Sequence, residues 1–334
     1  MKLRLLISLT WVSVCAVPAV ADPASRAQAL AMFGKVDAAT EAAVNAPQAQ
    51  LGRALYWDTR ASADGKTACA SCHAADSWSS DVRKLSVDAR GKFTSRHSQP
   101  IFNSMMQPHL RWTGDRANGA AQAEGSLTGS MGFETKEAAV ARLKELGYAE
   151  VFKNVFPADA EPVSARNYAQ AIQAYETTLT NPAPFDKFLA GNDAALNPQQ
   201  KRGLTAFVSN GCVACHSGPL LGGAAFQKFG LVKPYWEATK SEKMDLGRFE
   251  NTKLEADKSV FRVAMLRNVT KTAPYFHDGS VAKLEDAVRI MGEVQMGKTI
   301  PEADIKDIVA FLASLAGEIP KNYSAPAEFV KAAK

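Results

Sequence analysis

Four of the five cysteines in this chain stand in a pattern that could hold a metal-carrying group. Segments 69–73 and 212–216 both read Cys-x-x-Cys-His. Two thiols at this spacing can form thioethers with the vinyl groups of one porphyrin, and the adjoining imidazole can bind its iron. The sequence therefore predicts two covalently bound haems c. The predicted attachment and iron-binding residues are Cys69, Cys72, His73, Cys212, Cys215 and His216.

A Cys-x-x-Cys pair also occurs in redox-active dithiols and as half of a zinc site. A dithiol does not require the histidine that follows both pairs here, and a zinc site would need further ligands nearby. The complete five-residue pattern, present twice, favours haem attachment over both alternatives.

The first 21 residues have the features of a secretory signal peptide. Lys2 and Arg4 precede an apolar stretch, and a small-residue cleavage site ends at Ala21. A lipoprotein anchored through Cys15 is the alternative, but the residue before Cys15 is a valine, which is larger than expected there. No later segment approaches the length of a membrane span. We therefore expect an exported, periplasmic chain.

Removal of the signal peptide would leave 313 residues, enough for two ordinary domains. The mature chain would carry 37 basic and 34 acidic residues, a net charge of +3, and haem propionates would lower that charge. No basic run or interleaved aromatic pattern indicates nucleic-acid binding. Charge on the surface could still steer a small redox partner.

The elements that must position the two motifs are expected to be helices. Apolar residues recur at helical spacing in 140–146, 168–179, 284–291 and 305–315, and no alternating strand pattern is present. Turn-forming residues gather in 181–198. The predicted fold is mostly α, with two cytochrome c-like haem domains joined by a short linker. The predicted boundaries are 1–21 for the signal peptide, 22–182 for the N-terminal haem domain and 183–334 for the C-terminal haem domain, whose last helix could pack back on the first domain.

The sixth ligand of the second iron would decide whether that haem only transfers electrons. Met291 follows Leu284 and Val288 at helical spacing, so a helix over this segment would turn it inward. A thioether ligand favours ferrous iron. Met296 is the second choice, and Met244, Met265 and His277 are weaker candidates.

Six ordered segments of the chain are 211–218, 221–223, 266–268, 272–279, 284–292 and 308–312. Together they resemble the bacterial dihaem cytochrome c peroxidase family, which includes the MauG-like enzymes. The similarity extends from about Leu51 to Leu315. In that family the C-terminal haem has the higher potential, its axial methionine falls at Met291, and the histidine at His277 is not an iron ligand.

The resemblance places peroxide chemistry at the N-terminal haem. It implies that Trp112 lies between the haems, that Gln122 is a distal glutamine and that Glu134 is the catalytic glutamate, with Glu124 as a fallback. Peroxide needs an open site on the iron, and a carboxylate in a dry pocket could move a proton between its oxygens. The glutamine could stabilise the developing charge.

The chain departs from the family pattern in two places. Many members place a distal histidine shortly after the first motif, but 85–91 contains none. We therefore expect an open first haem, with His97 and His109 as the alternatives that could cap it. The family also binds calcium through carbonyls at Thr272 and Pro274 and an asparagine, but here that asparagine is replaced by His97, a poor calcium ligand.

Three functions remain open from the sequence. The favoured one is a peroxidase that reduces hydrogen peroxide to water with electrons from a small cytochrome c or cupredoxin. The second is a MauG-like enzyme that oxidises residues of a partner protein, although such members have tyrosine at the position of Met291. The third is a non-enzymatic electron carrier with Met105 or Met131 on the first haem. The resemblance also implies a homodimer as one form of assembly.

Overall fold

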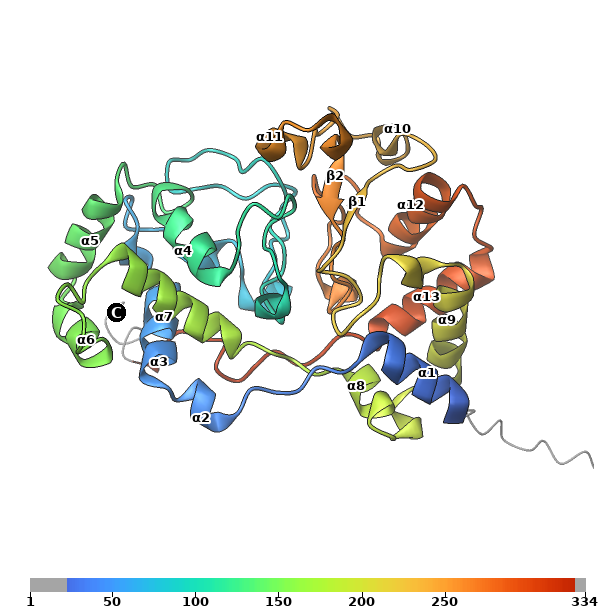
Figure 1. The fold of residues 1–334 in the computed structure, drawn as a ribbon, viewed down its shortest axis with the longest axis horizontal. Helices are drawn as coiled ribbons and strands as arrows, with labels where there is room; N and C mark the ends of the chain where they lie inside the picture. Colours follow the sequence, from blue (N-terminus) through green and yellow to red (C-terminus); the bar gives the residue numbers. More distant parts are fainter. Residues whose placement is uncertain (1–22, 328–334) are drawn as a thin grey trace, which may run out of the picture.

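A computed structural model describes residues 23–327. The predicted signal peptide, including Cys15, lies outside these residues. Figure 1 shows two groups of helices with loops and a short two-stranded sheet between them, so the prediction of a mostly α fold is confirmed. Among residues 23–327, none of the helices is long and apolar enough to cross a membrane.

The first group of helices packs around one core that also contains the first haem motif. Buried apolar residues of α3, α4, α5 and α7 meet there, and Cys69 packs against them. The hydrophobic period of 168–179 predicted α7, and the period of 140–146 predicted α5, which is followed by Gly147 at positive φ. This group contains α2 (Glu41–Val44), α3 (Pro47–Trp57), α4 (Gly119–Thr128), α5 (Lys136–Glu145), α6 (Ala149–Val155) and α7 (Ala165–Thr177).

The second group forms a separate core around the second motif. Its terminal helix begins after Pro301, as predicted, and α12 continues through Gly292 to Met296. The segment 181–198, predicted as turns, contains the short helix α8 with Pro184 in its first turn. This group contains α1 (Pro23–Phe33), α8 (Pro184–Leu189), α9 (Pro198–Ser209), α10 (Tyr235–Thr239), α11 (Phe249–Thr252), α12 (Leu284–Met296) and α13 (Glu302–Ala313).

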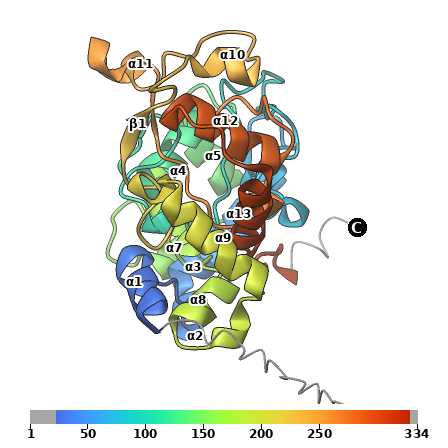
Figure 2. The same cartoon turned by 90° about the vertical axis from the view of Figure 1, so that its right-hand side faces the viewer.

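Both cores use a glycine to bring two helices into close contact. A Cβ on Gly52 of α3 would lie 1.8 Å from the carbonyl oxygen of Ala171 in α7. A Cβ on Gly203 of α9 would lie 1.8 Å from the carbonyl oxygen of Asp307 in α13. Figure 2 shows α9 and α13 side by side. In each half, the helix before the haem motif can therefore pack directly on a later helix.

The two ends of the described chain each pack with the half that is distant in sequence. Helix α1 joins the second core, where the ring of Phe33 lies 5.7 Å from that of Phe185. Beyond α13, which packs on α9, the chain returns to the first core through Tyr323. The hydroxyl of Tyr323 donates a hydrogen bond to the backbone carbonyl of His73.

A two-stranded antiparallel sheet was not predicted from the sequence. It consists of β1 (Phe226–Lys228) and β2 (Val260–Arg262), with Phe226 opposite Arg262. Each strand has only three residues, which is too short to give a readable alternation of apolar and polar side chains. The backbone N–H of Arg262 donates to the carbonyl oxygen of Trp112 at 2.7 Å, so this sheet contacts the first half of the chain.

Candidate haem sites and the joint between them

Both Cys-x-x-Cys-His motifs begin with a short 3-10 turn. The backbone N–H of His73 donates to the carbonyl of Cys69 at 3.1 Å, and that of His216 donates to Cys212 at 2.9 Å. The four cysteines of the motifs are half-buried.

Each motif histidine is held by a backbone carbonyl through Nδ1. The partner of His73 is Ser79, at 3.0 Å, and the partner of His216 is Leu221, also at 3.0 Å. Burial lowers the pKa of both imidazoles, which favours the neutral form. A neutral ring that donates through Nδ1 presents the lone pair of Nε2, which is the usual arrangement of a histidine that binds a metal. Both motifs therefore fit a haem iron.

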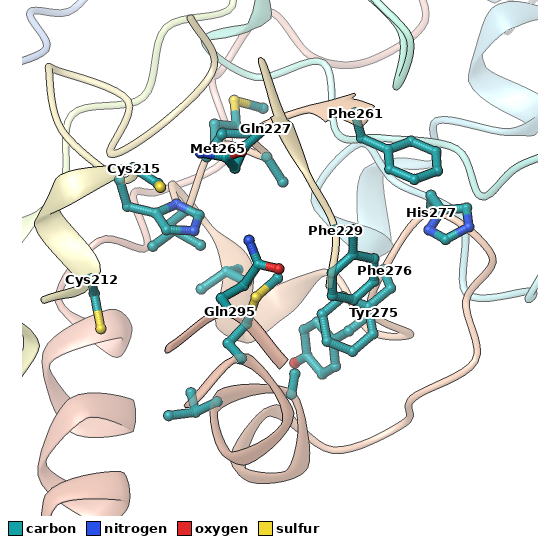
Figure 3. Close-up of a pocket in the computed structure, with 18 of the residues that line it drawn as sticks. Cys212, Cys215, Gln227, Phe229, Phe261, Met265, Tyr275, Phe276, His277 and Gln295 are labelled. Carbon is teal, nitrogen blue, oxygen red and sulfur yellow. The ribbon is translucent and has the colours of Figure 1, made fainter. Parts of the chain in front are cut away.

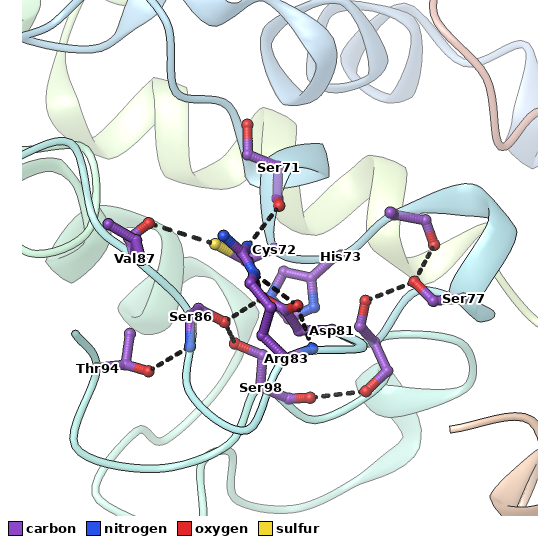
Figure 4. A network of polar contacts seen from close by, with 12 residues as sticks. Ser71, Cys72, His73, Ser77, Asp81, Arg83, Ser86, Val87, Thr94 and Ser98 are labelled. Carbon is purple, nitrogen blue, oxygen red and sulfur yellow. Dashed lines mark hydrogen bonds and ion pairs between the residues drawn. The ribbon is translucent and has the colours of Figure 1, made fainter. Parts of the chain in front are cut away.

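The loop after the first motif is fixed by a network of polar contacts, shown in Figure 4. Asp81 accepts hydrogen bonds from Arg83 at 2.7 Å and from Ser86 at 2.6 Å, and Arg83 also reaches the carbonyl of Ser71 at 3.2 Å. The carbonyl of Val87 lies 3.9 Å from the sulfur of Cys72. The segment in which many family members place a distal histidine is thus held against the first attachment turn.

A cavity of about 510 Å³ adjoins the second motif, within the usual range for a small-molecule or cofactor site, roughly 300–1,000 Å³. Cys212, Cys215 and His216 lie on its wall, together with mostly apolar side chains (Figure 3). A large apolar cavity next to two thiols and an imidazole fits a porphyrin. The chemistry of these donors supports haem at this position.

Met291 and Met296 both line this cavity but belong to different parts of its wall. Met296 lies beside the attachment turn, with its sulfur 3.7 Å from where a Cβ on Gly211 would be. Met291 packs in a separate cluster with Phe229 and Trp112. Helix α12 therefore turns Met291 inward, as its spacing predicted. Its role as the axial ligand remains a prediction.

Trp112 lies at the joint between the two halves of the molecule. It lines the second cavity, and its indole N–H donates to the carbonyl of His97 at 2.8 Å. The ring of His277 lies 6.2 Å away, stacked on Phe261. The Nε2 of His277 is 3.4 Å from the hydroxyl of Tyr235. These contacts fit a structural role for His277 beside the haem.

The two histidines that could cap the first haem have other contacts in this structure. His97 is buried and lines the second cavity. Its Nδ1 contacts the carbonyl of Arg83 at 3.1 Å, and its Nε2 contacts the hydroxyl of Ser80 at 3.4 Å. His109 is exposed, and its ring lies 5.8 Å from that of Phe226.

The candidate groups for peroxide chemistry differ in their exposure. Gln122 is half-buried on α4, while Glu134 is exposed just before α5. The role of Glu134 as the catalytic glutamate stays a prediction. Glu124, the fallback, forms an ion pair of 2.5 Å with Lys136.

Sequence reasoning missed two residues beside the first motif and one beside the second cavity. Glu176 on α7 lies near Cys69, and burial raises the pKa of Glu176 to about 8. Tyr323 reaches the carbonyl of His73 from the other end of the chain. Arg262 lines the second cavity. The strong apolar face of α7 indicated that this helix is buried, but it did not single out Glu176. Nothing in the sequence indicated the positions of Tyr323 and Arg262.

Calcium receives no direct support from the side chains. In the part of the chain that the structure describes, no three His, Cys, Asp or Glu side chains gather as a metal site. Thr272 and Pro274 line the second cavity, and the hydroxyl of Thr272 lies 3.5 Å from the carbonyl of Asn268. Calcium binding by the carbonyls of Thr272 and Pro274 stays a prediction.

Comparison with known proteins gives consistent results. A family model described as di-haem cytochrome c peroxidase matches residues 46–194. Cytochrome c551 peroxidase of Pseudomonas aeruginosa is 41% identical over 283 residues, covering 83% of this chain and 81% of that protein. Cytochrome c peroxidase Ccp of Escherichia coli is 40% identical over 279 residues; the match covers 82% of this chain but only 59% of that longer protein. The crystal structure of a MauG-like protein associated with microbial copper homeostasis has a TM-score of 0.72 and 26% identity, covering 84% of this chain and 93% of that one.

Proposed function

Because this chain belongs to the di-haem cytochrome c peroxidase family, we propose a division of labour between its two haem sites. The protein is a cytochrome c peroxidase with two haems c, which reduces peroxide with electrons from a cytochrome c. In our proposal, electrons enter at the second haem, held by His216 and Met291, and peroxide reacts at the first, held by His73. The haems, when bound, supply the iron that binds peroxide and carries electrons.

One observation supports this division above the others. Two thioether side chains, Met291 and Met296, line the same cavity as His216, whereas the imidazoles of His97 and His109 contact other groups. A six-coordinate second iron suits electron transfer, and an open first iron suits peroxide binding.

The side chains around the first haem have proposed roles in handling the substrate. Gln122 would donate a hydrogen bond to the peroxide oxygen on which negative charge develops. Glu134 would accept a proton from one peroxide oxygen and return it to the other. Trp112, between the halves of the molecule, would be the aromatic bridge for electrons.

The cellular setting is also part of the proposal. A periplasmic location fits the signal peptide expected in residues 1–21, and the donor would be a small periplasmic cytochrome c or cupredoxin. We propose the domains 22–182 and 183–334, with α1 and the segment after α13 exchanged between the two cores. A homodimer is the proposed alternative to a monomer.

A steady-state assay tests the peroxidase function. The purified holoenzyme should oxidise a reduced small cytochrome c when hydrogen peroxide is added, and a variant with His73→Gly should lose this activity while the second haem stays attached. The oxidised enzyme should also have a high-spin component in its optical spectrum from an open first haem. Absence of peroxide-dependent oxidation in the fully loaded protein would contradict the function, and a purely low-spin spectrum would contradict the open site.

A MauG-like activity on a partner protein is the second candidate, supported by the 26% identity to a MauG-like structure. Such members have tyrosine where this chain has Met291, and methionine favours reduced iron and incoming electrons. The higher identity to a peroxidase also favours the peroxidase function over a MauG-like activity.

The third candidate, an electron carrier, would need Met105 or Met131 as a ligand of the first haem. Met131 is buried in the first core, and the sulfur of Met105 lies against Gly119. The potentials of the two irons separate the second and third candidates.

A further inference from the structure

Two of the arginines in the described chain are almost completely buried, and their partners differ. Arg267, 0% exposed, forms an ion pair with Asp186, with N–O distances of 2.5 and 2.8 Å. Arg262, 2% exposed, has no carboxylate partner among residues 23–327. A buried guanidinium without an anion is costly, because the charge has lost its water and gained no opposite charge.

The hydrogen bonds of Arg262 go to neutral oxygens. Nη2 donates to the side-chain oxygen of Gln99 at 2.7 Å, Nη1 donates to that of Gln107, and Nε donates to the carbonyl of Arg111 at 3.1 Å. These partners keep the guanidinium in place but do not neutralise it. Burial lowers the pKa of Arg262 to about 10, which still leaves the group protonated at pH 7.

The position of Arg262 indicates where the missing anion would lie. The side chain lines the cavity beside Cys212, Cys215 and His216. A porphyrin in that cavity would bring two propionate carboxylates, which are the preferred partners of a guanidinium fork. An apolar ligand would leave the charge of Arg262 uncompensated.

Arg262 also holds the segment that carries Trp112. Its side chain bonds to Gln107 and Arg111, and its backbone N–H donates to the carbonyl of Trp112 at 2.7 Å. One strand residue therefore faces the second haem cavity on one side and fixes the bridging tryptophan on the other.

We propose that Arg262 binds a propionate of the second haem and positions Trp112 against that haem. This inference rests on the proposed function, since it requires a haem in the second cavity. Arg262 is a positioning residue, which contributes its charge to the haem and its hydrogen bonds to the Trp112 segment. Both effects can be measured separately.

The charge should affect the potential of the second haem. A positive charge near iron favours the reduced state, because reduction lowers the positive charge of the centre. In Arg262→Gln, the second haem should therefore bind an electron about tenfold less favourably, which lowers its midpoint potential by about 59 mV. Arg262→Lys keeps the charge and should restore the potential, but a single ammonium cannot replace the three-way hydrogen bonding.

The hydrogen bonds should affect the mobility of the Trp112 segment. Amide hydrogen exchange in residues 107–118 of the holoenzyme should speed up in both Arg262→Gln and Arg262→Lys. The combination of a restored potential and a loosened segment in Arg262→Lys would not be produced by a residue with a merely structural role.

Arg248→Gln is the matched control. Arg248 also contacts this interface, through the carbonyl of Thr113 at 3.3 Å and the ring of Phe226, but it does not line the cavity. Its removal deletes the same charge and should shift the potential much less than Arg262→Gln. Gln99→Glu places a carboxylate of the protein next to Arg262 and should lower the potential of the second haem, as Arg262→Gln does. This variant replaces Arg262→Gln in the experiment if Arg262→Gln does not fold.

The outcomes distinguish this inference from the proposed function. An unchanged second-haem potential in Arg262→Gln, or in Gln99→Glu if the former does not accumulate, would overturn the role of Arg262 while leaving peroxidase activity to stand. Equal shifts in Arg262→Gln and Arg248→Gln would overturn it too. Wild-type protein that carries two haems but does not oxidise cytochrome c with peroxide would refute the proposed function instead.

Discussion

The guanidinium of Arg96 and the carboxylate of Asp245 form two hydrogen bonds of 2.7 Å each, although they are 149 residues apart. Arg96 also contacts Glu250 at 2.7 Å, and Asp245 lies 3.6 Å from the Nε2 of His277. The pair joins the loop of the first half to the second half next to Trp112. Burial works to raise the pKa of Asp245, but the hydrogen bond and charge of Arg96 lower it overall.

Asp245→Asn should weaken the joint between the two halves. We expect the free energy of unfolding at pH 7 to fall by about 2 kcal/mol, because charge-assisted hydrogen bonds are lost and Arg96 keeps a weaker partner. Because the pKa of Asp245 is lower in the folded state, its carboxylate stabilises the fold at pH values above the unfolded-state pKa, near 4. This stabilisation is lost as the pH falls through the folded-state pKa. The difference between variant and wild type in chemical denaturation should therefore shrink below about pH 4.

The exposed pair between Glu302 and Arg289 provides a control for that experiment. Glu302→Gln should change the free energy of unfolding very little, since an exposed ion pair is screened by water. A loss at pH 7 as large for Glu302→Gln as for Asp245→Asn would contradict the importance of the Arg96 pair.

Met291→Leu should remove the proposed axial thioether from the second haem while keeping an apolar side chain of similar size. We expect the midpoint potential of that haem to fall by on the order of 100 mV, since axial ligands set haem potentials over roughly 0.8 V. Redox titration followed by optical spectra gives the measurement. Met296→Leu is the control and should leave the potential close to that of the wild type; the reverse result would assign the ligand to Met296.

The sequence predicted the haem attachment and the periodic helices for different physical reasons. The spacing of thiols and imidazole is set by the porphyrin, so the motifs can be read directly. Helix α7 was readable because Tyr168, Ile172 and Tyr175 repeat at helical spacing and are all buried. The short strand containing Arg262 has no such period, and its burial depends on residues far away in the chain.

Glu134→Gln should reduce kcat for peroxide by about a hundredfold or more if Glu134 transfers the proton, in line with the usual contribution of general acid–base groups. The KM for the reduced cytochrome should change little, because the donor would bind elsewhere. Steady-state kinetics give both constants. Glu137→Gln, on the first turn of α5, is the control, and Glu124→Gln tests the fallback. A large loss in Glu124→Gln with none in Glu134→Gln would move the role to Glu124.

Glu176→Gln should make the protein more stable at neutral and alkaline pH. Burial raises the pKa of Glu176 to about 8, so folding stability falls as the pH rises from the unfolded value, near 4, to about 8. The glutamine variant does not carry this cost, and its advantage in chemical denaturation should grow between pH 5 and about 8 and then level off. The exposed Glu150→Gln should show no such trend. An advantage that is constant with pH would contradict the titration of Glu176.

The catalytic assignments were harder to predict than the haem ligands. Glu134 and Gln122 depend on a family pattern with loose spacing, and the structure leaves Glu134 in solvent. Glu176 lies on a helix whose position was predicted correctly, yet its proximity to Cys69 depends on how the first attachment turn packs against the first core. The periodicity of a local sequence predicts its helices well, but it does not predict which distant segments pack together.

The hydrogen bond from Tyr323 to the carbonyl of His73 has a consequence for the order of assembly. Tyr323 follows His73 by 250 residues, so it is synthesised long after the first attachment motif. The contacts of the N-terminal core are therefore complete only after the segment beyond α13 has been synthesised. A fragment that stops at Leu315 would keep both attachment motifs and every proposed iron ligand, but it would leave the backbone behind His73 without this support.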